Sequence, residues 1–586
     1  MEQQRVGGGS EIAARVVHRR VRYHENASGL FALLGGTQAR DAVLLESADI
    51  TTHSGLTSVM VLRGSLRVTC VEQEVRLEVL SPSGELLASR VREQLAEFLV
   101  EQGSGTPAGV FRFLSPDELA KQQQARGVMM EERERLLAPS PALVLRKLQM
   151  DPGYEDPSGT LPFLAGGFAF DYLGTFETLS PFNEQRSRVG EDAEGAEGAE
   201  AERVAIEEIG NTYPDYQFIA AEIMLTINHE EATAELVALD VGDSAELQAE
   251  LDRLAEIIEH ANTADAEDAA GAEANVSRET LARRDAAEPG TLPVSVDVSD
   301  AEFRDLVTQM KQEIYNGEIY QVVPARTFSA PCPDAFAAYR QLRDTNPSPY
   351  MFYLRGVDQC GEPYELFGAS PESNLKFDAE TREVQLYPIA GTRPRGLTPT
   401  GEVDLELDIR AELELRTDDK EIAEHTMLVD LARNDLARVA VPRTRAVAEL
   451  LQVDRYSRVM HLISRVTATL DPEFDALDAY RACMNMGTLT GAPKLRATDL
   501  LRRAEGKRRG SYGGAVGYLR GDGDMDTCIV IRSAYVRRGV AMVQAGAGVV
   551  RDSQPQAEAD ETLHKAYAVL RALALADNGK EPEVQR

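Results

Sequence analysis

Apolar residues recur at helical spacing from Asp418 to Arg438, so this stretch is predicted to form an amphipathic helix. Glu421, Glu424 and His425 fall at positions i, i+3 and i+4, which share one face of such a helix. Like charges crowded beside a histidine are unfavourable unless a cation or another partner compensates them. The helix therefore predicts either a cation-binding face or a face that is solvated.

A second acidic helix is predicted near the C-terminal end, where the sequence reads PQAEADETLHKAY. There Glu558, Glu561 and Lys565 fall at i, i+3 and i+7 of the helix. Two acidic faces from distant segments could together hold a hard cation such as Mg²⁺, which takes oxygen ligands. Acidic faces of surface helices are usually only solvated, so spacing alone leaves both interpretations open.

Alternating apolar and polar residues predict strands elsewhere in the chain. In the first part they cover 41–50, 58–71, 75–81 and 166–177, with a helical region at 117–148. Later strands are expected at 321–326, 387–393, 527–536 and 540–550, after a helix at 300–316. Because helices and strands do not alternate strictly, an α+β fold is favoured over a doubly wound parallel sheet.

At 586 residues the chain is long enough for two or more domains. The segments 189–202 and 261–290 are rich in Ala, Glu, Asp and Gly, and too poor in apolar residues to offset the entropy of ordering. We therefore expect a flexible leader over 1–20 and an N-terminal domain over 21–260 that contains the first acidic segment. The second acidic segment is expected to be a linker to a C-terminal domain over 291–580.

The acidic composition excludes some partners. The formal net charge is −34, which argues against broad binding of nucleic acid or anionic membrane. No run approaches the ~20 apolar residues of a membrane span. The N-terminus lacks the apolar core of a secretory signal, and the five scattered cysteines form no CxxC pair. These features predict a cytoplasmic protein, in which an anionic ligand would need a local basic pocket.

Several small or basic residues are candidates for that pocket. Gly391 and Thr392 offer backbone N–H groups and a hydroxyl at a turn, and Arg532 lies in an apolar stretch where it needs a carboxylate partner. The glycines at 513–514 and 546–548 offer bare backbone for close approach by a ligand. Taken singly, each glycine cluster is better explained by tight strand packing or a β-bulge.

Three further residues are candidates for proton transfer or positioning. Glu372 follows a predicted strand end, where a desolvated carboxylic acid could donate a proton, although most Glu residues are simply exposed. His461 lies in an apolar strand, where a histidine is more often a core residue than a catalyst. Thr488 is a loop hydroxyl that could also cap the following helix.

Nine motifs, in order, resemble the chorismate-utilising enzymes, and more narrowly the anthranilate synthase component I family. The similarity is dense from about 295 to 573 and patchier from about 28 to 228. The resemblance implies large, mostly antiparallel β-sheets packed as a sandwich with helices outside. The motifs are NPSPYMFYL (346–354), LFGASPES (366–373), PIAGTRPRG (388–396), EIAEHTMLVDLARNDLARV (421–439), VDRYSRVMHLIS (453–464), GTLTGAPK (487–494), GSYGGAVGY (510–518), DTCIVIRSA (526–534) and QAGAGVVRDSQPQAEADET (544–562).

The same resemblance assigns roles to the candidate residues. Chorismate would be the substrate, and Glu424 and Glu561 would ligate Mg²⁺, supported through water by Glu421 and Glu558. Glu372 would protonate the departing C4 hydroxyl while ammonia attacks C2. His461 would serve the elimination of pyruvate, and Thr488 would line the site. The residues expected to bind chorismate are Gly391, Thr392, Tyr512, Arg532, Gly546, Ala547, Gly548 and Lys565.

Two positions distinguish anthranilate formation from related reactions. Relatives that make aminodeoxychorismate typically carry a nucleophilic Lys where this chain has Ala390. Relatives that add water tend to have a Lys base where this chain has Gln321, whose amide can orient ammonia but cannot act as that base. The chain also lacks a Gly-x-Cys-x-Gly motif, so the resemblance implies a separate glutamine amidotransferase subunit, anthranilate synthase component II, in a heterotetramer of two large and two small subunits.

The N-terminal part resembles the tryptophan-binding regulatory region of the family. LLES (44–47) and NPSPYM (346–351) match its feedback site, with Ser47, Pro349, Tyr350 and Met351 as expected contacts. Such a site would let L-tryptophan inhibit the enzyme by biasing two domains. Ordinary interdomain packing is the plainer interpretation.

Two alternatives remain. The chain could be another chorismate enzyme, making aminodeoxychorismate or isochorismate, or a non-catalytic tryptophan-binding regulatory subunit. Ala390 and Gln321 argue against the first, and Glu372, His461, Glu424 and Glu561 argue against the second.

Overall fold

The computed structural model describes residues 14–47, 56–101, 108–126, 130–180, 210–261, 290–398, 402–456 and 459–585. The predicted acidic insertion 189–202, and all of the predicted linker except Ala261 and Gly290, lie outside these residues. The predicted leader 1–20 was too long, because Ala14–Val21 forms strand β1, antiparallel to β9. β1 is rich in Arg and pairs with a strand more than 200 residues away, so its own alternation is a weak signal.

The strands of the first part form one antiparallel series in which β3 and β8 are central. β3 pairs along one edge of β8, and β7 and β9 pair with successive stretches of its other edge, while β3 itself also pairs with β2 and β4. β6 joins β4, and β5 joins β6. The strands are β2 (Ala42–Glu46), β3 (Thr57–Val71), β4 (Glu74–Val79), β5 (Leu99–Glu101), β6 (Gly109–Arg112), β7 (Leu164–Phe168), β8 (Tyr216–Asn228) and β9 (Thr233–Val241).

The series continues without a break into the second part of the chain. From β2 it runs through β13, β14, β23, β24, β12 and β10 to β25, and only the last pair is parallel. The bounds are β10 (Thr291–Val296), β12 (Ala325–Pro331), β13 (Tyr350–Val357), β14 (Pro363–Ser370), β23 (Ser533–Arg537), β24 (Val540–Gly546) and β25 (Glu581–Val584).

A second arm leaves the first part at β7. It runs through β21, β22, β15 and β16 to β19, which also pairs with β17 and β18. β11 and β20 form a separate short pair. The bounds are β11 (Gln321–Val322), β15 (Ser373–Asp378), β16 (Glu383–Leu386), β17 (Ile389–Pro394), β18 (Ala446–Arg455), β19 (Val459–Thr469), β20 (Gly491–Ala492), β21 (Ala515–Leu519) and β22 (Met525–Ile529).

β3 contains a β-bulge, at which the strand bends. Its register against β8 shifts between Val61 and Leu66, and β3 pairs with β2 before the shift and with β4 after it. A Cβ at Gly64 would lie 2.6 Å from the side chain of Ile219, so the close approach there favours glycine. Apolar side chains from both arms meet in a shared core that includes Val61, Ile219, Phe352, Leu366, Val516 and Tyr535.

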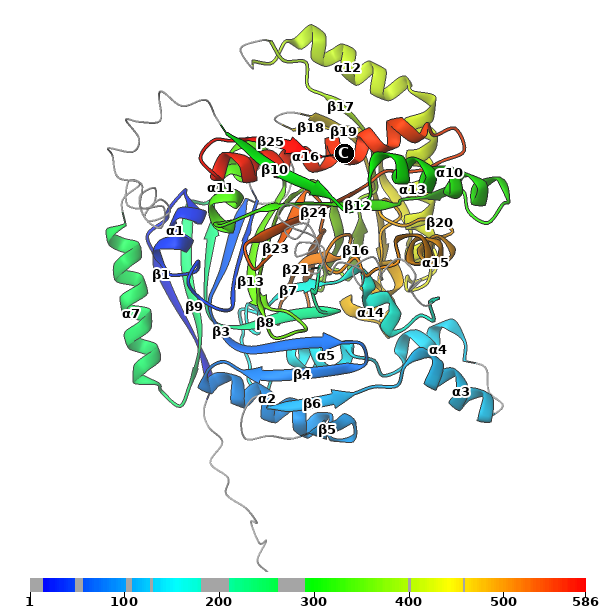
Figure 1. Ribbon diagram of the computed structural model, residues 1–586. Helices are drawn as coiled ribbons and strands as arrows, with labels where there is room; N and C mark the ends of the chain where they lie inside the picture. Colours follow the sequence, from blue (N-terminus) through cyan, green and yellow to red (C-terminus); the bar gives the residue numbers. More distant parts are fainter. Residues whose placement is uncertain are drawn as a thin grey trace, which may run out of the picture.

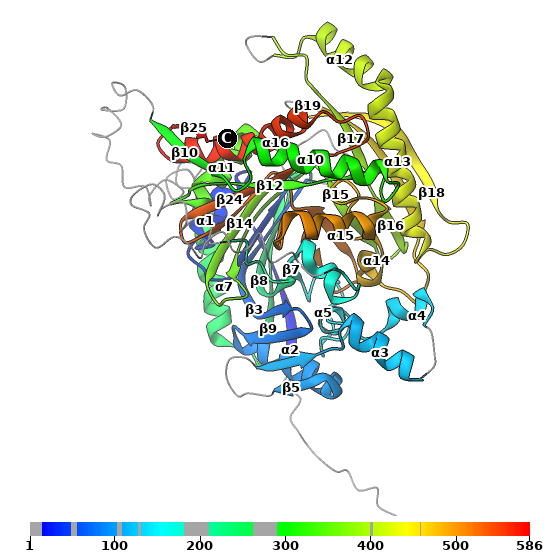
Figure 2. The same ribbon diagram turned by 45° about the vertical axis from the view of Figure 1, so that its right-hand side comes forward.

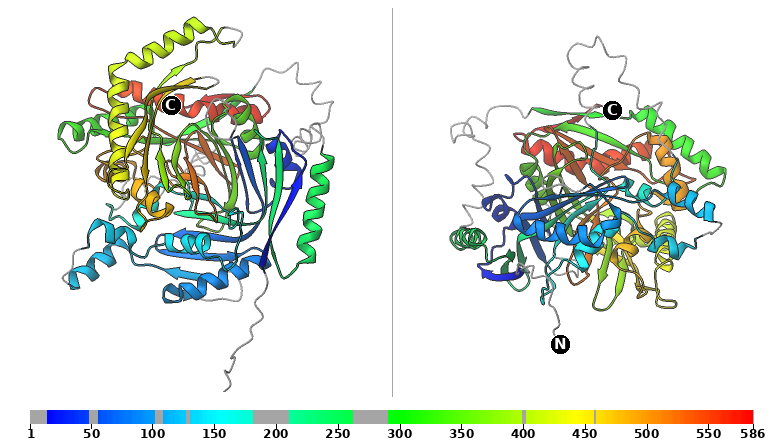
Figure 3. Two further views of the ribbon diagram at one scale, coloured as in Figure 1. Left: turned by 180° about the vertical axis from the view of Figure 1, so that it is seen from behind. Right: turned by 90° about the horizontal axis from the view of Figure 1, so that it is seen from below.

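Helices lie on the outside of these sheets (Figures 1 and 3), as the α+β sandwich prediction requires. Amphipathic faces on α7, α11 and α16 cover one core, and those on α2, α5 and α14 cover another. The helices are α1 (Ala27–Leu33), α2 (Pro82–Gln94), α3 (Pro116–Arg126), α4 (Glu132–Leu137), α5 (Ala142–Met150), α7 (Ala245–His260), α10 (Asp300–Tyr315), α11 (Ala335–Thr345), α12 (Leu405–Thr417), α13 (Asp419–Ala437), α14 (Ala476–Cys483), α15 (Lys494–Glu505) and α16 (Pro555–Ala576).

The two acidic helices predicted from the sequence are both present. α13 begins after Asp418, whose side chain caps its first turn, and it lies against β17 and β19 with α12 extending beyond it (Figure 2). α16 begins with Pro555 at its first position. The predicted strand 166–177 is partly wrong, since β7 ends at Phe168 and Phe170–Thr175 forms a 3₁₀ helix. In the described part of the chain, no helix combines the length and apolarity needed to span a bilayer.

Candidate functional site

The acidic faces of α13 and α16 converge. Burial raises the pKa of Glu424, and the neighbouring charges of Glu421 and of Glu561, on the other helix, raise it further. Lys420 and Lys565 oppose this effect. A carboxylate influences another in this way only at short range, so Glu424 and Glu561 lie in one site.

Protein groups hold each of these carboxylates. The Gln321 side-chain amide donates to Glu424 Oε1 at 2.8 Å, and Lys565 Nζ lies 2.6 Å from Glu561 Oε1. Lys565 also donates to the carbonyl oxygen of Gly546 at 3.0 Å. Glu421 accepts from Arg393 at 2.9 Å. Polar contacts therefore join α13, α16, β11 and β24 around one space.

Carboxylate oxygens are suitable ligands for a divalent cation, but the side chains are not arranged as a complete metal site. Among the residues that the structure describes, no three His, Cys, Asp or Glu side chains form a ready-made metal cluster. Glu558 is buried, which raises its pKa, and the charge of Glu561 adds to the effect while a hydrogen bond with Ser553 opposes it. The pKa values of Glu424 and Glu558 are raised first by burial, and the like charge of Glu561 adds to the shift of each. A hard cation that takes oxygen ligands, such as Mg²⁺, would offset that like charge.

Gly391 was expected at a turn, but it lies within β17, at a shift in the register of this strand against β19. Gly391 has φ +85°, and a Cβ there would lie 2.9 Å from Leu415 and 3.2 Å from Glu421 Oε2, so both conformation and space require glycine. The next residue, Thr392, places its hydroxyl 2.9 Å from Nδ1 of His461 on the paired strand β19. β17 thus connects the acidic helix with the predicted histidine.

His461 is buried, and burial lowers its pKa to about 4. The nearby Arg532 guanidinium lowers the pKa further, while a hydrogen bond with the backbone of Gly391 opposes the shift. The imidazole is therefore neutral at neutral pH and available as a proton acceptor.

Burial shifts the pKa of Glu372 in the opposite direction to that of His461. Glu372 lies between β14 and β15, is only 7% exposed, and burial raises the pKa of its carboxyl to about 8. The Thr488 hydroxyl donates to its Oε1 at 3.0 Å, and this hydrogen bond, like the charges of Lys565 and Arg532, only partly offsets the effect. The side chain therefore carries a proton at neutral pH and can donate it.

Arg532 was predicted within a continuous strand over 527–536, and that part of the prediction is wrong. β22 ends at Ile529 and β23 begins at Ser533, and Arg532 between them has φ +49°. Burial lowers the pKa of its guanidinium, and the charges of Glu561 and Glu372 act in the other direction. The break in the strand places this cation among the acidic groups of the site.

The glycines after β24 give close backbone approach. A Cβ at Gly546 would lie 2.8 Å from the Pro324 carbonyl oxygen and 3.2 Å from the Tyr512 hydroxyl. A Cβ at Gly548 would lie 3.1 Å from Gln321 Nε2 and 3.4 Å from Glu424 Oε1. Ala547 between them is buried, and its N–H donates to the Pro324 carbonyl at 3.1 Å. This segment therefore lies close to Tyr512, Gln321 and Glu424.

Sequence reasoning gave no role to Lys420, or to the link from Arg393 to α13. Lys420 lowers the pKa of Glu424 and Glu558, and Arg393 also pairs with Asp418 at 2.8 Å. A lysine and an arginine beside a run of carboxylates were the available signal. Both cations moderate the negative charge of the acidic faces.

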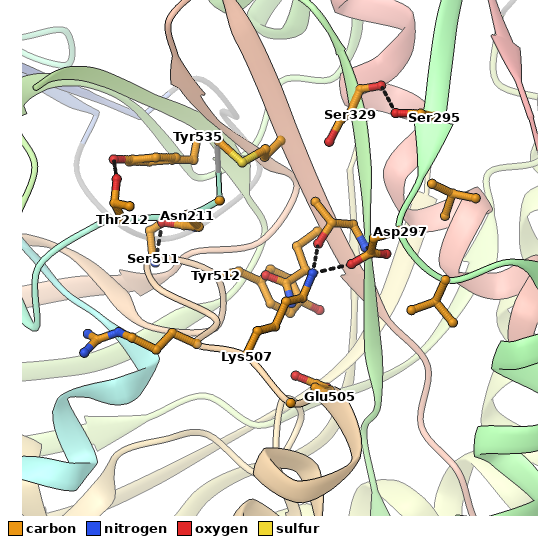
Figure 4. A pocket seen from close by; sticks show the side chains of 18 of the residues that line it. Asn211, Thr212, Ser295, Asp297, Ser329, Glu505, Lys507, Ser511, Tyr512 and Tyr535 are labelled. Carbon is orange, nitrogen blue, oxygen red and sulfur yellow. Dashed lines mark hydrogen bonds and ion pairs between the residues drawn. The ribbon is translucent and has the colours of Figure 1, made fainter. Parts of the chain in front are cut away.

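A separate cavity of about 570 Å³ lies next to Tyr512 (Figure 4). Of the residues predicted to bind substrate, Tyr512 lines this cavity. Lys507 reaches across it to Asp297 and donates to the Thr327 hydroxyl at 3.1 Å. Its wall is mainly hydroxyls, amides and paired charges, so it differs from the acidic region described above.

The four predicted regulatory residues also meet. Ser47, Pro349, Tyr350 and Met351 line one cavity of about 390 Å³, next to the pairing of β2 with β13. Among the described residues, the buried Ser47 Oγ has no hydrogen-bond partner. Tyr350 donates to Asp526 at 3.1 Å on the cavity wall. An orphaned hydroxyl in a half-apolar cavity is suited to a small ligand with a polar group.

Sequence comparison finds relatives along nearly the whole chain. Residues 150–571 match the family model described as chorismate binding enzyme. The chain is 44% identical over 571 residues to anthranilate synthase component 1 of Vibrio cholerae, covering 97% of both chains. It is 43% identical to anthranilate synthase component 1 of Escherichia coli strain K12, covering 95% of this chain and 96% of that one.

Solved structures agree on the fold. Anthranilate synthase component I from Streptococcus pneumoniae superposes with a TM-score of 0.58 at 24% identity, covering 88% of this chain and 92% of that one. The menaquinone-specific isochorismate synthase of Escherichia coli gives a TM-score of 0.56 at 18% identity, covering 96% and 95%. The chain therefore belongs to the chorismate-binding enzyme family, among the relatives of anthranilate synthase component 1.

Proposed function

We propose that this chain is the large subunit of an anthranilate synthase, which converts chorismate and ammonia to anthranilate and pyruvate. The observation that carries the proposal is a buried acid, Glu372, and a buried neutral base, His461, that both lie within electrostatic range of Arg532. Formation of anthranilate needs a proton for the departing hydroxyl and a later loss of a ring proton. The environments of these two side chains suit those two steps.

Substrate binding is assigned to the basic and backbone groups around the acidic faces. Arg532 and Lys565 would bind carboxylate. Gly391, Gly546 and Gly548 would admit the ring close to backbone N–H groups. Tyr512, Thr392 and Ala547 would complete the wall. Glu424 and Glu561 would hold Mg²⁺, with Glu421 and Glu558 in support, and the bound ion would polarise a substrate carboxylate.

Glu372 would donate its proton to the C4 hydroxyl, which leaves as water while ammonia attacks C2. The Thr488 hydroxyl fixes the Oε1 of the acid, so the proton is held at a defined position. His461, oriented by the Thr392 hydroxyl on Nδ1, would then take the C2 proton as the enolpyruvyl group leaves. Loss of that proton makes the ring aromatic.

Two neighbours support anthranilate over the other products of this family. Ala390 on β17 offers no nucleophile to the ring, so a covalent adduct is excluded at that position. The Gln321 amide bonds to Glu424 and is not a base, which disfavours activation of water. An amide beside the acidic faces can still orient ammonia, which is a nucleophile without prior deprotonation.

The relatives named component 1 imply a second component by their name, and in this proposal that component is a glutamine amidotransferase subunit that supplies ammonia. A heterotetramer of two large and two small subunits in the cytoplasm is the assembly we propose. L-tryptophan would inhibit by filling the 390 Å³ cavity, where its amino or carboxylate group would satisfy the orphaned Ser47 hydroxyl.

The deciding experiment supplies the purified chain with chorismate, Mg²⁺ and an ammonium salt, with and without L-tryptophan. We expect anthranilate and pyruvate in equal amounts, and less of both when tryptophan is present. Aminodeoxychorismate or isochorismate without pyruvate would replace this proposal by another chorismate reaction. Tryptophan binding without any turnover would point to a regulatory subunit.

A further inference from the structure

A narrow crevice lies behind Glu372, on the side that faces α13. Glu372 and Thr488 line one part of it, and Asp435 of α13 lines another. Its volume of about 20 Å³ leaves room for roughly one water molecule. The remaining wall is mostly apolar, including Leu428 and Leu431 of the same helix. A water there would find its polar partners at Glu372, Thr488 and Asp435.

Asp435 is buried and forms an ion pair with Lys494. Lys494 Nζ, at the start of α15, donates to Asp435 Oδ2 at 2.6 Å and to the Cys483 carbonyl oxygen at 2.6 Å. Both side chains are 11% exposed. Burial raises the pKa of Asp435, and Lys494 and Arg438, the cations that face it, oppose the shift. Cys483, on α14, is the other titratable neighbour.

The proposed function requires a group that returns a proton to Glu372 after each turnover. Each turnover removes the proton of Glu372, and the bound substrate would block the open side of this buried acid. We propose that Asp435, paired with Lys494, returns a proton to Glu372 through a water molecule in this crevice. Lys494 Nζ gives its proton to Asp435, Asp435 gives one to the water, and the water gives one to the Glu372 carboxylate. Solvent then reprotonates Lys494, so one proton is taken up per cycle.

This inference rests on the proposed function, because it assigns Glu372 as the acid. The plainer interpretation is that Asp435 and Lys494 only tie α13 to α15. Asp435→Asn separates the two, since the amide has nearly the same volume and can still accept from Lys494 but cannot carry the proton. Asp430→Asn is the matched control, because Asp430 lies on the same helix, is exposed and pairs with Arg433 at 2.7 Å.

The test measures ammonium-dependent anthranilate formation in H₂O and D₂O. For Asp435→Asn we expect kcat to fall by about tenfold or more with unchanged KM, and the solvent isotope effect on kcat to increase, because proton return becomes limiting. Asp430→Asn should match the wild type. A folded Asp435→Asn variant with kcat within about twofold of wild type would overturn the proposal.

If Asp435→Asn does not fold, the variant Gly487→Ala tests the proton relay instead. Its Cβ would lie 2.4 Å from Leu431 Cδ2, so Leu431 must move and the crevice changes without any change of charge. The same loss of kcat with a larger isotope effect supports the relay, and an unchanged isotope effect overturns it. The proposed function is judged separately, since it fails if the wild type itself makes no anthranilate.

Discussion

The proton on Glu372 makes both catalysis and stability decline as pH rises, in different pH ranges, and Glu372→Gln tests both. With a pKa of about 8, roughly nine-tenths of the molecules carry this proton at pH 7 and about one-tenth at pH 9. Activity that needs the acid form should therefore fall as pH rises through about 8. In Glu372→Gln the acid is lost, and we expect kcat to fall by about 10²–10⁴-fold.

The stability argument uses the same pKa. Its folded-state value, about 8, lies above the ordinary 4.5, so the unfolded chain loses the proton first as pH rises. This group therefore favours unfolding progressively from about pH 4.5 to 8, by up to about 5 kcal/mol at about 1.4 kcal/mol for each pH unit. Glu372→Gln removes this penalty, so the variant should be the more stable protein at pH 8 and should show little difference at pH 4.5.

The assay follows anthranilate formation with free ammonia held constant at each pH, because ammonia itself titrates in this range. Unfolding in urea at pH 4.5 and pH 8 gives the two stabilities. Glu365→Gln, at a partly exposed carboxyl on β14, is a control for the loss of one charge. A Glu372→Gln variant that keeps wild-type kcat, or that is no more stable at pH 8 than the wild type, would refute the reasoning.

Three further predictions concern the other sites. Glu424→Gln and Glu561→Gln should each abolish turnover while circular dichroism stays unchanged, and near-normal activity at ordinary Mg²⁺ in either would contradict the metal assignment. Removing divalent cations with a chelator should stop anthranilate formation, and added Mg²⁺ should restore it; full activity in the chelator would exclude a cation. Ser47→Leu should fill part of the 390 Å³ cavity and relieve tryptophan inhibition with little change in turnover, and unaltered inhibition would count against that cavity.

Periodicity predicted the two acidic helices well, because apolar and acidic residues recur at helical spacing along α13 and α16. It could not show that Glu424 and Glu561, separated by more than 130 residues, meet in space. That expectation came from the resemblance. β1 was missed because its pairing with β9 is non-local. The break at Arg532 was missed because the β-branched run 529–531 precedes it and Tyr535 and Val536 follow shortly after it.

The protonation of the site lay beyond pattern reasoning for a physical reason. Glu372 and His461 have shifted pKa values because surrounding segments exclude water from them, and burial depends on the whole packed fold. The crevice that joins Glu372 to Asp435 is formed by four separate stretches of chain and has no local sequence pattern. Residue types could therefore be predicted, but their ionisation states could not.

The pairing of β2 with β13, and of β7 with β21, has a consequence for attempts to dissect the protein. The sequence can be divided near residue 290, but a cut there leaves strand edges on both fragments without their hydrogen-bonded neighbours. Neither half should therefore be expressible as a well-behaved soluble piece, and a ligand in the cavity beside β2 would stiffen the same continuous sheet that carries β14 and Glu372. The inhibitor cavity and the catalytic residue Glu372 would then be connected through one continuous sheet.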